Sequence, residues 1–170
     1  MKKAGNIFGW KSSKDAYAIA VTIALVLASV LLVTYYVALR PLPEEYTNIY
    51  LLDSNRKAAD YPEFVVANLN STFSVYIDVE NHLNDTLSNF QVQVKIVSNT
   101  NPTFPIDANP TQTFTGTVQK DAIWETPVTI SLDQPGNYLV AFELWIPSRG
   151  GLHFSDDFCV LNVQVAAETV

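Results

Sequence analysis

The chain has 170 residues, of which 48% are hydrophobic and only 16% are charged. This composition excludes collagen, coiled coil and low-complexity disorder, and the single cysteine excludes a disulfide framework within the chain. Residues 1–40 carry five basic side chains against one acidic, whereas residues 41–170 carry five against sixteen. Because the second part would be repelled by phosphate backbones, nucleic-acid binding is disfavoured.

An uncharged apolar run over residues 16–39 is the strongest signal in the sequence. As a helix it extends about 36 Å, enough to cross a hydrocarbon core of about 30 Å with a modest tilt. A cleaved secretory signal has a shorter apolar core, and a pilin-type leader has its apolar stretch close behind the cleavage point. Neither pattern matches this segment, so we predict one permanent transmembrane helix.

The flanks of this run predict its orientation. Four lysines precede it, whereas the segment just after it is mainly acidic. The positive-inside rule then makes residues 1–15 a cytoplasmic basic tail, residues 40–45 a linker, and the rest of the chain extracytoplasmic. The lipid bilayer is thus the first predicted partner. Side chains suited to the membrane interface are Trp10, Tyr35, Tyr36 and Arg40.

Beyond the linker, apolar and polar side chains alternate strictly, which is the pattern of half-buried strands. The segments with this pattern are 73–80, 90–96, 128–132 and 138–146, and weaker strands fit 47–52 and 111–119. The last segment, 158–165, is apolar on both faces at first and alternates at its end. Turn sequences separate them, and the polar stretch 98–110 is predicted as a long loop. The fold class is therefore mostly β: an immunoglobulin-like antiparallel β-sandwich over residues 46–166, with a short tail at 167–170.

Several short motifs in this part of the chain resemble one known family. In chain order they are YLL at 50–52, KAADYP at 57–62, VENH at 79–82, WETPV at 124–128, PGNY at 135–138 and FEL at 142–144. Their order and spacing are similar to those of the outer β domain of the archaeal domain-of-unknown-function family 1616, over nearly all of residues 46–165. The resemblance implies an archaeal membrane protein with an external β domain and no established reaction.

The side chains that could carry catalysis do not form a familiar set. Cys159 lies on the apolar side of its strand and is predicted to be a buried thiol. A blue-copper site would add His82, His153 and a methionine, but the only methionine is Met1. The carboxylates at 156–157 are expected on opposite faces of a strand, a poor arrangement for a glycosidase. We therefore predict no enzymatic activity, no cofactor and no metal site.

Other residues are candidates for modification or for contact with a partner. Glycosylation sequons begin at Asn70 and Asn84, on the side predicted to be external. Trp145 and Leu139 share an apolar second face of their strand, and Tyr76 lies on the outward face of another. A partner could cover the face of Trp145, and so could the long loop or an edge strand.

The function predicted from these features is that of a non-catalytic, single-pass accessory subunit. Its β domain would bind or brace integral-membrane subunits of a larger complex. The alternative is a cell-surface structural or adhesive protein, in a filament or an envelope layer, joined by strand addition. A copper- or metal-dependent redox protein ranks below both.

Overall fold

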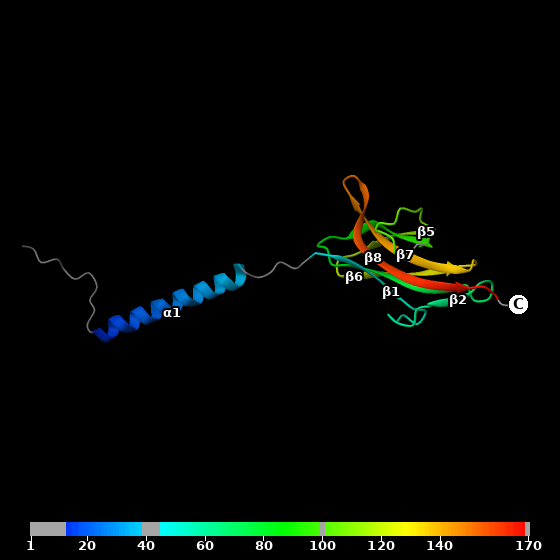
Figure 1. Ribbon diagram of the computed structural model, residues 1–170. Helices are drawn as coiled ribbons and strands as arrows, with labels where there is room; N and C mark the ends of the chain where they lie inside the picture. The colour runs from blue at the N-terminus through cyan, green and yellow to red at the C-terminus, as the bar shows by residue number, and fades with distance from the viewer. Residues whose placement is uncertain (1–12, 39–44, 99–100, 169–170) are drawn as a thin grey trace, which may run out of the picture. The chain divides into compact units, whose positions relative to one another are not determined.

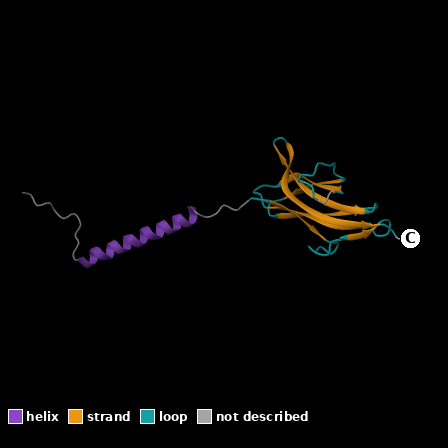
Figure 2. Ribbon diagram, in the orientation of Figure 1, coloured by secondary structure: helices purple, strands orange, loops and turns teal. Residues whose placement is uncertain are grey.

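The structure is a computed structural model that describes residues 13–38, 45–98 and 101–168. The chain divides into two units, one containing the helix α1 and the other, beginning at Glu45, containing all the strands (Figures 1 and 2). The predictions made for Trp10 and Arg40 lie outside the described residues.

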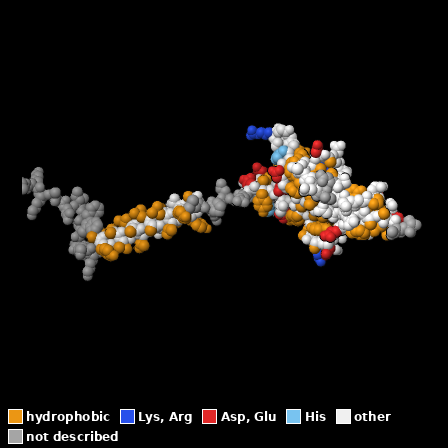
Figure 3. Space-filling view, in the orientation of Figure 1, with side chains coloured by type: hydrophobic (Ala, Val, Ile, Leu, Met, Phe, Trp, Pro, Cys, Tyr) orange, Lys and Arg blue, Asp and Glu red, His pale blue; other side chains and the backbone are white. Residues whose placement is uncertain are grey.

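Helix α1 spans Ser13–Ala38, and Ala16–Ala38 is long and apolar enough to cross a membrane. Hydrophobic side chains cover it along its length (Figure 3). The hydroxyls of Thr22, Ser29 and Thr34 each donate to the carbonyl four residues earlier, at 2.8–2.9 Å. The helix thus satisfies these polar groups itself, as a hydrocarbon environment requires. These properties fit a membrane anchor or a signal sequence.

Two sheets make up the second unit. The strands are β1 (Thr47–Leu52), β2 (Phe64–Val66), β3 (Thr72–Asn81), β4 (Leu87–Val97), β5 (Gln112–Val118), β6 (Ala122–Ser131), β7 (Gly136–Ser148) and β8 (Gly151–Ala166). One sheet has the order β1-β3-β6 and the other β2-β8-β7-β4-β5. The pairs are antiparallel except β2–β8, which is parallel. The predicted mostly β sandwich is confirmed.

Four details differ from the sequence prediction. The strand β6 begins at Ala122 instead of residue 128. The strand β2 was not predicted, because three residues are too few to show an alternating pattern. The strand β8 begins at Gly151 instead of residue 158, since its first half pairs with β7 around the Ser148–Gly151 turn. The turn at residues 81–85 leads from one sheet to the other, because β3 pairs with β1 and β6 whereas β4 pairs with β5 and β7.

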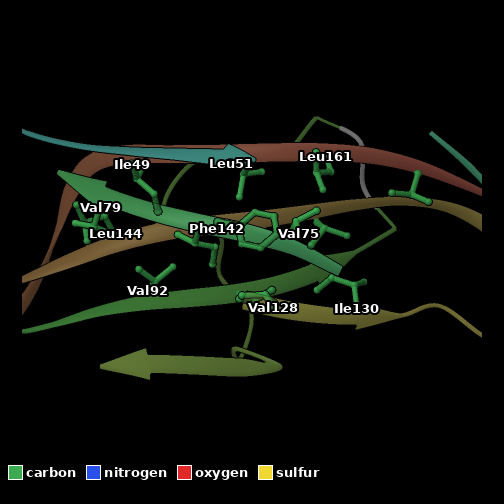
Figure 4. Close-up of a cluster of buried hydrophobic side chains, with 14 of the residues drawn as sticks. Ile49, Leu51, Val75, Val79, Val92, Val128, Ile130, Phe142, Leu144 and Leu161 are labelled. Carbon is green, nitrogen blue, oxygen red and sulfur yellow. The ribbon is translucent and has the colours of Figure 1, made fainter. Parts of the chain in front are cut away.

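The hydrophobic core lies between the two sheets. Most of the alternating residues of β3 and β4 that were expected on the inner face are fully buried, among them Val75, Val79 and Val92, whereas Phe73 and Ile96 are half-buried. Figure 4 shows labelled side chains from both sheets filling the space between them. Burying this apolar surface is what stabilises the sandwich, because each large aliphatic side chain contributes about 1.5–3 kcal/mol.

The two open sides of the sandwich are closed by particular side chains. On one side, the Cys159 thiol of β8 donates to the Ile49 carbonyl of β1 at 3.1 Å. On the other, the Gln112 side chain of β5 donates to the Thr129 carbonyl of β6 at 2.8 Å. The lack of a side chain at Gly116 lets the Phe90 ring pack closely against β5 there. A Cβ added at Gly116 would lie 2.5 Å from that ring.

Candidate functional site

The outer face of the five-stranded sheet carries a buried ion pair. Alternation along β4 and β7 places Lys95 and Glu143 on this face, yet they are only 3% and 0% exposed. The Lys95 ammonium donates to Glu143 Oε2 at 2.8 Å and to the Ile106 carbonyl at 2.8 Å. The Ile106 amide donates to Glu143 Oε1 at 2.6 Å, and the Trp145 indole donates to Oε2 at 3.2 Å. Both charges are therefore compensated, as burial demands.

This ion pair fixes the long loop between β4 and β5 to the sheet. Ile106, in the middle of the loop, packs on Leu139 and Ala141 in a small second hydrophobic cluster. Leu139 is only 4% exposed as a result. For Leu139, the loop is thus the cover, which was one of the alternatives that the sequence left open.

Beside the loop lies a group of four rings that we call the outer aromatic cluster: Phe104, Trp145, Phe154 and Phe158. The rings of Phe104 and Phe158 stack with centroids 3.8 Å apart. Phe154 links them to Trp145, with centroids 6.3 Å from Phe158 and 5.9 Å from Trp145. Phe158 remains 41% exposed. Aromatic side chains that stay accessible on a fixed surface are common anchors of protein interfaces.

The outer face of the three-stranded sheet holds Tyr76. Its ring lies beneath the Arg56 guanidinium, 4.5 Å from centroid to Cζ, and Arg56 also pairs with Glu125 at 3.0 Å. The turn that carries Arg56 is organised by Asp53, whose carboxylate accepts the amides of Asn55 and Lys57 at 2.8 Å. Those bonds lower the pKa of Asp53. A side chain of the same chain therefore covers one face of the half-buried Tyr76.

Next to Tyr76 on β3, Asp78 is only 6% exposed, and its Oδ1 has no hydrogen-bond partner among the described residues. Burial, and to a lesser degree the nearby Glu125 carboxylate, raises the pKa of Asp78. The Tyr50 hydroxyl donates to Glu80 at 3.0 Å, and burial together with this bond raises the pKa of Tyr50. This face thus holds acidic groups that disfavour one another's ionisation.

The other predicted site residues lie apart from these two faces. Asn70 and Asn84 are exposed. The Asn70 side chain accepts the Val66 amide at 2.6 Å, and the Asn84 amide group contacts Glu45. Both sequons are therefore accessible. The tyrosines near the end of α1, also exposed, are Tyr35 and Tyr36.

The residues considered for copper chemistry are dispersed. Cys159 is half-buried on β8, where burial raises its thiol pKa to about 11. His82 lies between Glu80 and Asp121, 3.5 Å from each, and His153 is exposed on β8. Within residues 13–38, 45–98 and 101–168, no three His, Cys, Asp or Glu side chains come together as a metal site.

Sequence reasoning missed the Lys95–Glu143 pair. The alternating pattern places Lys95 among outward polar residues, and it also places Glu143 in the same row as Leu139 and Trp145. A carboxylate within an otherwise apolar row was the available signal, because such a group requires a buried cation or hydrogen-bond donors. The pairing itself depends on the sheet order, which alternation does not reveal.

The acidic residues at 156–157 were expected on opposite faces of a regular strand. They lie in a bulge, because Glu143 pairs with Phe158 whereas Trp145 pairs with Phe154. Asp156 has a positive φ of 69°, and the Asp157 carboxylate accepts the Thr47 hydroxyl at 2.7 Å. The simple rule of opposite faces does not apply in a bulge.

The fold and these surfaces define the class of the molecule: an immunoglobulin-like β-sandwich domain that follows a helix apolar enough to cross a membrane. The chain belongs to the family described as a domain of unknown function, DUF1616, whose model matches residues 41–145. This finding confirms the family to which the sequence motifs pointed.

Solved structures support the same fold. The chain is similar to the CARDB domain of the PF1109 protein from Pyrococcus furiosus in solution, with a TM-score of 0.52 and 12% identity over 75% of this chain and 100% of that domain. A crystal structure of that domain in complex with di-metal ions gives a TM-score of 0.52 and 11% identity, over 75% of this chain and 99% of the domain. At these identities the likeness concerns the fold alone. No curated protein matches the chain.

Proposed function

We propose that this protein is a non-catalytic, single-pass membrane protein whose β domain lies outside the cell and binds partner subunits of a larger membrane complex. The apolar helix α1 and the lysines before it support the anchor and its orientation. The archaeal origin and the membrane association implied by the family resemblance stay predictions.

The outer aromatic cluster is the observation that carries the binding role. The buried Lys95–Glu143 pair fixes the loop beside it, so the surface is ordered before a partner arrives. A surface that is ordered in advance loses less conformational entropy on binding. The exposed ring of Phe158 and the half-buried ring of Trp145 then supply apolar contact area.

Mild-detergent extraction of the tagged full chain from its native membrane tests this proposal. Two variants are matched, because each replaces an exposed apolar side chain on a different sheet: Phe158→Ser (41% exposed) and Ile123→Ser (55% exposed). We expect an integral-membrane partner to copurify in stoichiometric amount with the wild type and with Ile123→Ser, and to be lost with Phe158→Ser. Migration of the wild type as a lone monomer, or equal retention in all three, would contradict the proposal.

The alternative role, a surface structural or adhesive protein, is favoured by a different observation. The strand β5 ends its sheet, and within the described residues no further strand of that sheet pairs with its outer edge. Structural assembly through such an edge would involve copies of one chain. The contact that the Cys159 thiol makes does not support the redox alternative, because this thiol is hydrogen-bonded to a backbone carbonyl of β1.

A further inference from the structure

The free edge of β5 differs from the other sheet edges of this molecule. An edge strand exposes unpaired backbone donors and acceptors, and soluble domains usually protect it with charge, proline, short length or a cover. In the part of the chain that the structure describes, β1 and β6 end one sheet and β2 and β5 end the other.

The edges of β1, β2 and β6 each show one of these protections. The strand β2 has only three residues. Side chains of β8 reach the edge of β1, where Cys159 donates to the Ile49 carbonyl. In β6, Pro127 has no amide hydrogen to donate, and the Thr129 carbonyl accepts the Gln112 side chain.

The same Gln112 side chain ties the first residue of β5 to β6, but the seven residues of β5 include no charge and no proline. Its inner face is held by Phe114 and Val118, while Thr113, Thr115 and Thr117 are exposed on the outer face. Threonine favours strands and makes favourable cross-strand pairs with threonine. The edge is thus suited to receive another strand.

We infer that β5 pairs antiparallel with β5 of a second copy of this chain, about a two-fold axis at Thr115. The row of threonines is self-complementary under this operation: Thr115 faces Thr115 of the second copy, and Thr113 faces Thr117. No like charges meet, although the domain as a whole is acidic. An isologous contact of this kind closes as a dimer.

The pairing also places the ends of the two domains. Thr47, at the start of the domain, pairs with Asn81, and the Asn81 side chain donates a hydrogen bond to the Val118 carbonyl. The start of the domain therefore lies near the end of β5. The two-fold axis reverses strand direction, so the starts of the two domains lie toward opposite ends of the dimer. This arrangement favours the alternative role, that of a surface structural or adhesive protein. It is less suited to a contact between two copies of the chain within one membrane complex.

Cysteine cross-linking of the full chain in detergent micelles tests the register. Directly opposed residues lie about 4.5–5.5 Å apart between Cα atoms, within disulfide range, whereas residues offset by four positions lie about 14 Å apart. We expect an oxidised dimer from Thr115→Cys, and from a mixture of Thr113→Cys and Thr117→Cys chains, but not from either of the latter alone. Thr129→Cys, an exposed threonine on the edge strand β6, is the matched control and should stay monomeric.

Charged substitutions at Thr115 test the same contact between copies without the need for a cross-link. Thr115→Lys places two ammonium groups opposite each other and should weaken dimerisation roughly fivefold or more, as should Thr115→Asp. Mixing the two variants should restore the dimer, because the pair is then of opposite charge. Analytical ultracentrifugation measures both results, and the exposed position keeps the fold intact.

Three outcomes would overturn the inference: a wild type that is monomeric at all concentrations, cross-links from Thr129→Cys equal to those from Thr115→Cys, or no recovery on mixing the charged variants. The result is independent of partner binding, because Phe158 lies on another part of the sheet. Loss of the copurifying partner in Phe158→Ser with an intact dimer, or the reverse, separates the two proposals.

Discussion

Among the residues that the structure describes, Lys95 and Glu143 are the charged side chains most completely removed from solvent, and each satisfies the other together with the Ile106 backbone. Pairs of this kind add little net stability compared with apolar residues, but losing one partner leaves an uncompensated charge in the interior. Their role is therefore to position the loop rather than to supply folding energy.

Lys95→Met should lower the free energy of unfolding by about 3–5 kcal/mol, because Glu143 is left buried without a cation. The double variant Lys95→Met/Glu143→Gln should lose less than the sum of the two single changes. Denaturant unfolding of the full chain in detergent measures both, with the exposed Lys57→Met as control. A loss below about 1 kcal/mol, typical of a surface pair, would contradict the buried arrangement.

The raised pKa of Asp78 predicts how the stability of the fold depends on pH. The sign of this dependence is opposite to that expected for a salt-bridged carboxylate. Burial raises its pKa, so the folded state holds the proton more tightly than the unfolded chain. Stability contributed by this group therefore falls as the pH rises from the unfolded value of 3.8 through the raised native value.

Asp78→Asn should consequently raise the free energy of unfolding at neutral pH by about 1 kcal/mol, since it removes a buried charge with an unpartnered oxygen. Well below pH 3.8 the variant and the wild type should be equally stable. Unfolding curves at the two pH values measure the difference. If the variant were the less stable at neutral pH, the Asp78 carboxylate would be making a stabilising contact instead.

At the scale of elements, the closing of the sandwich beside β5 depends on the lack of a side chain at Gly116. An added Cβ would lie 2.5 Å from Phe90 Cζ and 2.8 Å from Trp124 Cε2. Gly116→Ala should cost about 1–3 kcal/mol by overpacking. Gly150→Ala, where nothing lies within 4 Å, is the matched control and should change stability little. Equal thermal midpoints for the two variants would refute this packing.

Alternation in the sequence was enough to predict most of the strands at least in part, because buried positions such as Val75 and Val92 recur at every second residue. It did not predict β2, which is too short, nor the first half of β8, whose side chains are mixed in character. It also missed the first half of β6, which contains Pro127. The turn at 81–85 was recognised, but its crossing from sheet to sheet was not, since turn residues mark a change of direction and not the next partner.

The candidate surfaces were only partly predictable for a related reason. Alternation placed Trp145, Leu139 and Tyr76 outward, and the structure shows that Ile106 covers Leu139 and that Arg56 covers one face of Tyr76. Both covers come from loops distant in sequence. Phe104 and Phe158 likewise meet across 54 positions of chain, so the outer aromatic cluster required the tertiary structure.

At the scale of the whole molecule, the account depends on one helix that anchors an external β domain. Family membership and the immunoglobulin-like fold are established for this chain, and the orientation is the part of the proposal that determines what the domain can meet. A direct measurement of sidedness therefore tests more of the account than any single substitution in the domain.

That measurement is the labelling of Leu69→Cys with a membrane-impermeant maleimide on intact cells. Leu69 is 74% exposed, and the native Cys159 contributes little background because its pKa is raised to about 11. The account predicts full labelling of intact cells, on a chain that stays in the membrane fraction after an alkaline carbonate wash. Labelling that appears only after the cells are opened, or a labelled chain released by the wash, would contradict it.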